Sequence, residues 1–203
     1  MKRTTYIMIG MYLGGLFLII VGCISLKTSV LKERQVITLN MSEEITKTDL
    51  NGINTVKIQT SDPSRYHYQG SSIDVIQAEG GSGSISYPVS PYIKTDKQGS
   101  TLVLKIDYES FLKENEKDGY DMMMQQAYIL VEASGQLVHI ENETLNTMKL
   151  EGLTADSLSL ASQSKLEVNN CNINSAYLLG SYIDFVAVNT TIQNMHADLD
   201  GIK

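Results

Sequence analysis

The sequence predicts an all-β protein in which an N-terminal membrane helix is followed by a parallel β-helix, that is, a β-solenoid-like domain. Three observations support this fold class: residues 6–26 carry no charge, apolar and polar residues alternate from Thr55 onward, and a repeat of eighteen to twenty residues starts near Leu145. A period of two is the side-chain spacing of a β-strand. A repeat this short cannot bury a core by itself, so it has to stack on its neighbours.

The first expected element is the uncharged run at residues 6–26, which follows Lys2 and Arg3. A helix of this length, at 1.5 Å per residue, would span the ~30 Å hydrocarbon core of a bilayer. The run is also more uniformly apolar than a buried helix of a globular protein. We therefore expect residues 6–26 to direct the chain to a membrane, as an uncleaved signal anchor or as a cleaved signal peptide.

Cys23 is the candidate lipidation site within this run. Ile20, Val21, Gly22 and Cys23 fit the lipoprotein pattern of two apolar residues, a small residue and a cysteine. Cleavage before Cys23 would leave a lipidated cysteine at the new N-terminus. The sequence allows either an uncleaved anchor or a lipoprotein. Both alternatives place the following residues next to a membrane, on the side that we expect to face away from the cytoplasm.

The chain is expected to have three parts. Residues 1–26 form the transmembrane anchor or signal peptide, residues 27–46 form a juxtamembrane stalk, and residues 47–203 form the β-helical domain. Strand alternation is clear from Thr55 onward, where apolar or β-branched residues alternate with Lys57 and Gln59. It is also clear in the segment STLVLKIDYES, where Leu102, Leu104 and Ile106 share one face.

The repeat gives the most specific structural prediction. Its segments begin at Leu150, Val168 and Val188, and Asn169 and Asn189 directly follow the last two. Val168 is expected to stack on Val188 and Asn169 on Asn189. Asparagine suits the bends because it tolerates left-handed backbone geometry and can bond along a ladder. An antiparallel sandwich is the alternative for residues 145–203.

No catalytic, cofactor or metal site is predicted. Calcium needs six to eight oxygen ligands, more than the isolated pair Asp198 and Asp200 supplies. The three histidines are far apart in the sequence, and the three adjacent methionines would point to opposite faces of a strand. These side chains are His67, His139, His196 and Met122–Met124. A net charge of −7 without a basic stripe argues against a nucleic-acid partner.

The order of motifs resembles a known group of families. The triplet Gly52–Asn54, the strand TVKIQTS, the segment PYIKTDKQGSTLVLKI and the Leu/Val-and-Asn repeat follow one another over roughly residues 47–203. In this order they resemble the head-GIN and auto-transporter adhesin-like domains of unknown function, which occur in bacterial envelope proteins provisionally named adhesins. The resemblance implies a β-helical fold, a signal peptide or membrane anchor, and no established enzymatic activity.

We therefore predict a membrane-anchored, non-enzymatic protein of the bacterial cell envelope with an adhesin-like interaction domain at residues 47–203. Its expected partners are the membrane, through residues 6–26, and a protein or glycan of the envelope. Self-association through the exposed end of the repeat is also expected, because open strand edges invite pairing. The alternatives are an envelope-stress regulatory accessory membrane protein and, less favoured, a carbohydrate-active β-helix enzyme.

Overall fold

The computed structural model describes residues 2–30, 44–60, 67–68, 72–115, 123–124, 128–144, 147–180 and 184–199. The chain divides into two compact units, Met1–Val36 and Ile37–Lys203.

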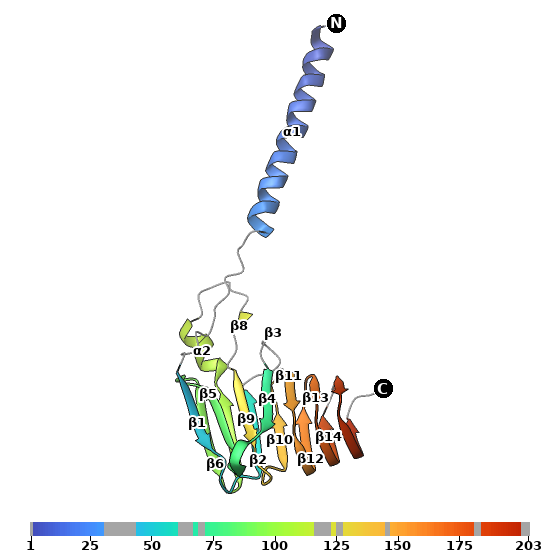
Figure 1. The fold of residues 1–203 in the computed structure, drawn as a ribbon. Coiled ribbons are helices and arrows are strands. Elements are labelled where there is room, and N and C mark those ends of the chain that lie inside the picture. The colour runs from blue at the N-terminus through green and yellow to red at the C-terminus, as the bar shows by residue number, and fades with distance from the viewer. Residues whose placement is uncertain are drawn as a thin grey trace. The chain divides into compact units, whose positions relative to one another are not determined.

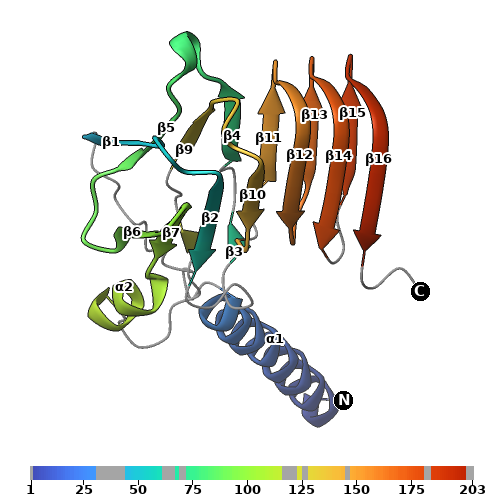
Figure 2. The ribbon, with the colours of Figure 1, turned by 90° about the horizontal axis from the view of Figure 1, so that it is seen from below.

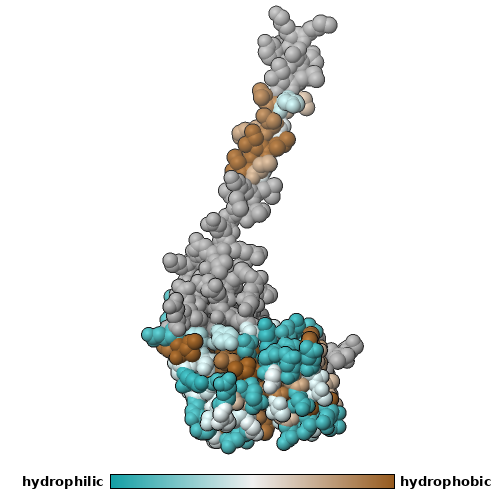
Figure 3. All heavy atoms as spheres, viewed as in Figure 1, coloured by the Kyte–Doolittle hydropathy of each residue, from teal (hydrophilic) through white to brown (hydrophobic). Residues whose placement is uncertain are grey.

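The N-terminal unit contains one long helix, α1, which extends from Lys2 to Val30. Its described side chains, between residues 10 and 25, are exposed and mostly apolar, apart from the half-buried Gly22 (Figure 3). Within the part of the chain that the structure describes, no helix has both the length and the apolarity needed to cross a membrane. This finding overturns the membrane helix that we predicted from residues 6–26.

The second unit is built from two seven-stranded sheets, which lie as two layers (Figures 1 and 2). Sheet A has the order β1-β5-β9-β4-β11-β13-β15, and sheet B has the order β16-β14-β12-β10-β2-β7-β6. The strands of sheet A are β1 Ile45–Asp49, β5 Ser84–Pro88, β9 Ile129–Ala133, β4 Ser72–Gln77, β11 Thr147–Glu151, β13 Leu166–Asn169 and β15 Phe185–Val188. Those of sheet B are β16 Thr191–Leu199, β14 Asn172–Gly180, β12 Thr154–Ser162, β10 His139–Asn142, β2 Thr55–Thr60, β7 Thr101–Ile106 and β6 Ile93–Gln98.

The predicted parallel β-helix is wrong, because both sheets are open and mix parallel with antiparallel pairs. The pairs β1–β5, β5–β9 and β6–β7 are antiparallel. The reason is clearest at β6 and β7, where a tight turn at Gly99 and Ser100, with Gly99 at φ +62°, reverses the chain. A purely antiparallel sandwich is not formed either, since the other pairs of the two sheets are parallel.

In the C-terminal half, successive strands alternate between the two sheets and pair in parallel. Leu150 lies opposite Val168, as the repeat predicts. In the next pair Val168 lies opposite Ala187, and Asn169 lies opposite Val188. The register is therefore one residue away from the predicted stacking of Val168 on Val188.

Left-handed residues at the bend fix this register. The residues that follow β11, β13 and β15 are Gly152, Asn170 and Asn189, with φ of +67°, +54° and +49°. Only glycine and asparagine adopt this conformation readily. The asparagine prediction is therefore confirmed at Asn189, whereas Asn170 rather than Asn169 takes the equivalent place.

In the bends after β13 and β15, the residue that follows the left-handed asparagine stabilises the neighbouring bend. The Sγ atom of the buried Cys171 accepts the Leu153 N–H at 3.4 Å, and Thr190 Oγ1 accepts the Cys171 N–H at 3.2 Å. Each side chain thus satisfies a backbone donor at the corner, where ladder hydrogen bonds are interrupted.

One hydrophobic core joins the two sheets. It includes fully buried side chains of both, such as Ile73 and Leu150 in sheet A and Leu104 and Ile140 in sheet B. In the inner strands, such as β2, β9 and β11, alternate residues point into this core, which is the pattern that a half-buried strand requires.

The remaining described elements are short. The strand β3, His67–Tyr68, pairs with β8, Met123–Met124. A single 3-10 turn covers Glu79–Gly81, and the helix α2 covers Tyr108–Asn115. Met122, the first residue of the predicted methionine triplet, lies outside the described residues.

Candidate binding site

The sequence-derived site residues are scattered over the molecule. Cys23 is a free, exposed thiol on α1, and its lipidation stays a prediction. His139 lies on β10, His196 and Asp198 lie on β16, and Asp200 lies outside the described residues. Among the residues that the structure describes, no group of three or more His, Cys, Asp or Glu side chains could hold a metal ion.

The outer face of sheet B carries a compact charged cluster. Lys57 Nζ lies 2.9 Å from Glu141 Oε1 and 2.7 Å from Glu143 Oε1, and Gln59 Nε2 donates to Glu143 Oε2 at 2.9 Å. Burial alone would raise the pKa of Glu143, but the hydrogen bonds and charge of Lys57 outweigh it and lower that pKa. The hydrogen bond to Glu143 raises the pKa of Lys57, with burial opposing it. Lys57 and Glu143 are therefore both charged at neutral pH.

A shallow groove of about 420 Å³ lies beside this cluster, lined in part by Glu141, Ala161 and Leu179. Tyr177, which is 45% exposed, lies on the same face of β14, with its ring centroid 6.1 Å from that of His196. Hydrogen-bonding groups next to an exposed ring could meet a hydroxyl-rich ligand. The groove is open, and its carboxylates are already paired with Lys57.

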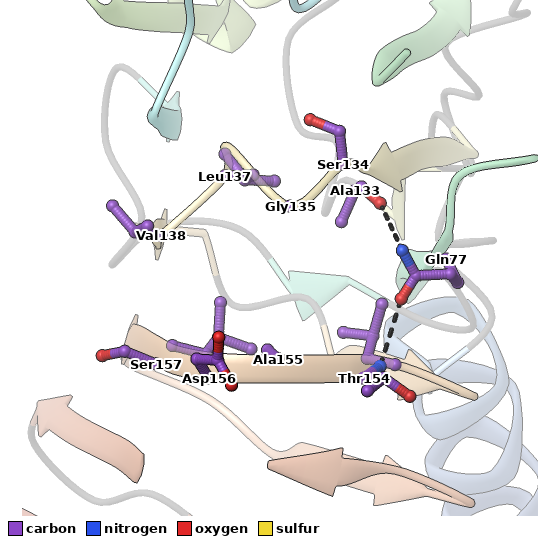
Figure 4. Close-up of a pocket in the computed structure, with 12 residues that line it drawn as sticks. Gln77, Ala133, Ser134, Gly135, Leu137, Val138, Thr154, Ala155, Asp156 and Ser157 are labelled. Carbon is purple, nitrogen blue, oxygen red and sulfur yellow. Dashed lines mark hydrogen bonds between the residues drawn. The ribbon is translucent and has the colours of Figure 1, made fainter. Parts of the chain in front are cut away.

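A narrower slot of about 300 Å³ lies beside the N-terminal half of β12 (Figure 4). One wall is Thr154–Leu158 of β12, and the other is the turn between β9 and β10, including Leu137 and Val138. Gln77, at the end of β4, closes one end (Figure 4).

The slot exists because β10 is shorter than β12. β10 pairs only with Ser159–Ser162, whereas β14 pairs with β12 from Thr154 onward. The segment Thr154–Leu158 therefore has a strand on one side and the slot on the other. It is an open strand edge inside the sheet.

Two hydrogen bonds mark the ends of this open edge. Gln77 Oε1 accepts the Thr154 N–H at 3.1 Å, and the Ser159 N–H donates to the Val138 carbonyl at 2.8 Å. Both N–H groups point away from β14, toward the side on which a neighbouring strand would lie. At ~3.3 Å per residue, roughly 16 Å of strand separates them.

The side chain of Gln77 acts here in place of a peptide unit. Its Nε2 donates to the Ala133 carbonyl at 3.3 Å while its Oε1 accepts from Thr154, so one carboxamide joins the end of β9 to the start of β12 (Figure 4). A backbone amide of an added strand would bond to both neighbours in the same way. The slot thus offers backbone hydrogen-bonding groups where a neighbouring strand would lie. Leu137, Val138 and Leu158 supply apolar contacts.

Sequence reasoning missed this slot. The alternation around Gln77 and the turn residues Ser134 and Gly135 are visible in the sequence, but they do not show which strands become neighbours. The open edge depends on the difference in length between β10 and β12, and therefore on the register of the sheet.

The chain matches no family model and no curated protein, so the resemblance to the head-GIN families stays a prediction. It is similar in structure to a provisionally named adhesin from Parabacteroides distasonis, with 11% identity over 81% of this chain and 70% of that one and a TM-score of 0.38. A provisionally named adhesin from Bacteroides fragilis gives 11% identity, coverage of 80% and 100%, and a TM-score of 0.33. A provisionally named lipid-binding protein from Parabacteroides distasonis gives 14% identity, coverage of 83% and 100%, and a TM-score of 0.33. At these identities and TM-scores, the likeness carries no argument about function.

Proposed function

We propose that this chain is a non-enzymatic interaction protein of the adhesin kind, and that its β domain binds an extended segment of a partner protein by strand addition to β12. The observation that carries this proposal is the open edge Thr154–Leu158, which faces a slot of about 300 Å³. In strand addition, main-chain hydrogen bonds give affinity and the side-chain pockets give specificity.

The slot suits such a ligand in length and chemistry. An edge of roughly 16 Å accepts about four or five extended residues. Val138 and Leu137 offer an apolar wall, while Ser157 and Asp156 line the side of β12. The ligand that fits is a short, extended peptide with an apolar side chain directed at Val138.

Val138→Lys tests the proposal, with binding of the purified full chain to an array of random seven-residue peptides as the measurement. Val138 is 42% exposed, so the fold should tolerate the change, while the long charged side chain would occupy the slot. Val89→Lys is the matched control, because Val89 is 43% exposed and lies after β5, outside the slot. Selective peptide binding should be lost in Val138→Lys and kept in Val89→Lys.

A second pair of variants shows whether the slot or the groove on sheet B is the binding site. Tyr177→Ala removes the exposed ring beside the groove, and Tyr128→Ala removes a ring of similar exposure, 50%, that precedes β9. If the chain bound a glycan array, and Tyr177→Ala but not Val138→Lys abolished that binding, the groove would be the binding site and strand addition at β12 would be wrong.

We also propose that the chain belongs to the bacterial cell envelope, with Cys23 as its lipidation site. The pattern Ile20, Val21, Gly22, Cys23 and the exposure of the Cys23 thiol support this. Mass spectrometry of the mature protein from its own host is the test. A diacylglyceryl group on an N-terminal Cys23 is the expected result, and an intact, unmodified N-terminus would contradict it.

A further inference from the structure

The C-terminal end of the β domain presents two open strand edges side by side (Figure 2). Among the described strands, β15 pairs only with β13 in sheet A, and β16 pairs only with β14 in sheet B. An edge strand carries a row of N–H and C=O groups that can pair with another chain.

Core positions reach the surface at this end. By register, Ile192 lies opposite Ile173, Met195 opposite Ala176, and Ala197 opposite Leu178. The three residues of β14 are at most 3% exposed, whereas Met195 is 55% exposed. The apolar layer that the sheets enclose is thus uncovered at β16, and another layer of strands would bury it.

The two ends of the sheets differ in how their edges are protected. The opposite edges carry lysines, Lys47 on β1 and Lys94 and Lys97 on β6. Lysine on an edge strand is a common device against edge-to-edge pairing. The sequence of β15, FVAV, has no charge, and β16 has Asp198 as its one acidic or basic residue apart from His196. Protective lysines are therefore missing from β15 and β16, the edges at which the core is uncovered.

We propose that β15 and β16 are the pairing surface for a second copy of this chain. Two identical edges pair antiparallel about a two-fold axis, and an axis normal to the sheets reverses both strands at once. β15 then pairs with β15 of the second copy, β16 pairs with β16, and both sheets continue across the axis. An edge pairs with its own copy across the axis without much repulsion when it carries little charge, and Asp198 is the one acidic side chain that β15 and β16 bring to this surface.

The oligomeric state of the full chain tests this pairing, measured by sedimentation velocity over a range of concentrations. The wild-type chain should dimerise, and Met195→Lys should weaken the dimer about tenfold or more, because an ammonium group would be buried without a partner. Leu179→Lys is the control, since Leu179 is exposed on β14, opposite Asp198, and points away from the core. A chain that stays monomeric, or a dimer that Met195→Lys leaves unchanged, as it would if α1 held the copies together, overturns the proposal.

Cross-linking separates the two-fold arrangement from other contacts. In a Cys23→Ser background, single cysteines at Gln193, Met195 and Ala197 report which residue of β16 lies nearest the axis. Antiparallel self-pairing predicts one position of maximal cross-linking with lower yields on either side, because only the residue on the axis faces itself. Equal yields at every position, or cross-links from β16 to a cysteine placed on β6, would show a different contact. The proposed peptide binding in the slot beside β12 does not depend on whether the chain pairs through β15 and β16.

Discussion

Cys171 is a buried cysteine whose environment should keep its thiol unreactive in the folded protein. Burial raises the pKa of the Cys171 thiol, and its Sγ donates to the Asn169 carbonyl at 3.1 Å. Because the thiolate is the form that attacks a disulfide reagent, and Cys171 is buried as a thiol, we expect Cys23 alone to react in the folded, unmodified chain at pH 8. Cys171 should react only after unfolding. Rapid labelling of two thiols in the folded protein would show that the bend at Cys171 opens.

The Lys57 cluster predicts a pH-dependent contribution to stability. The pKa of Glu143 is lowered from 4.5, so its contribution is present above that value and is lost as the pH falls through the folded-state pKa. Lys57→Met leaves Glu141 and Glu143 side by side without their cation. We expect the free energy of unfolding at pH 7 to fall by about 1–2 kcal/mol, and this deficit relative to the wild type to shrink at pH 3, where protonated Glu143 no longer needs the cation. Urea titrations at pH 7 and pH 3 check this. An equal deficit at both pH values would show that Lys57 acts through packing instead.

At the scale of single elements, the carboxamide of Gln77 determines how β12 begins. Gln77→Ala leaves the Thr154 N–H and the Ala133 carbonyl without this partner. We expect it to lower the free energy of unfolding by about 0.5–1.5 kcal/mol, because Thr154 is exposed and the Ala133 carbonyl still accepts the Ala78 N–H. Gln77→Glu keeps the acceptor for Thr154 and loses the donor to Ala133, so it should cost less at neutral pH. Urea unfolding of the two variants provides the measurement. If Gln77→Glu lowered the free energy of unfolding more than Gln77→Ala does, the bridging role of the Gln77 carboxamide would be wrong.

The elements also show how far sequence patterns reach. Period-two alternation identifies strands such as β2 and β7, because it depends only on which side chains face the core. It does not give their pairing. The repeat placed Leu150 opposite Val168 correctly but shifted the next pair by one residue, because the left-handed bend lies at Asn170 rather than Asn169. Consecutive asparagines leave that choice to the geometry of the neighbouring strands.

On the scale of the whole molecule, one core predicts one unfolding transition for the β domain. Ile140 is fully buried on β10, between β2 and β12 in sheet B. Ile140→Ala should lower the free energy of unfolding by about 2–4 kcal/mol. Because the core is shared, peptides from β2 and from β14 should lose protection together in hydrogen exchange measured by mass spectrometry. Loss of protection at β2 alone would mean that the two halves unfold separately.

The overall architecture could be predicted only in part. The all-β character of the second unit follows from local alternation, whereas the mixture of parallel and antiparallel pairs depends on contacts between distant segments. β9 shows this well: it lies between β5, which is antiparallel to it, and β4, which is parallel to it, and its own sequence ILVEA favours neither. The candidate slot was unpredictable for the same reason, since strand length and register create it.

The difference between the two ends of the sheets limits how many copies of the chain can assemble. A chain that pairs through β15 and β16 has Lys47 on β1 and Lys94 and Lys97 on β6, so among the described strands the two outermost edges that remain are both protected by lysine. Assembly then closes at two copies, whereas neutral strands at both ends would propagate into a fibre. The lysines of β1 and β6 would in that case act as terminators, and their loss would turn a finite particle into a filament.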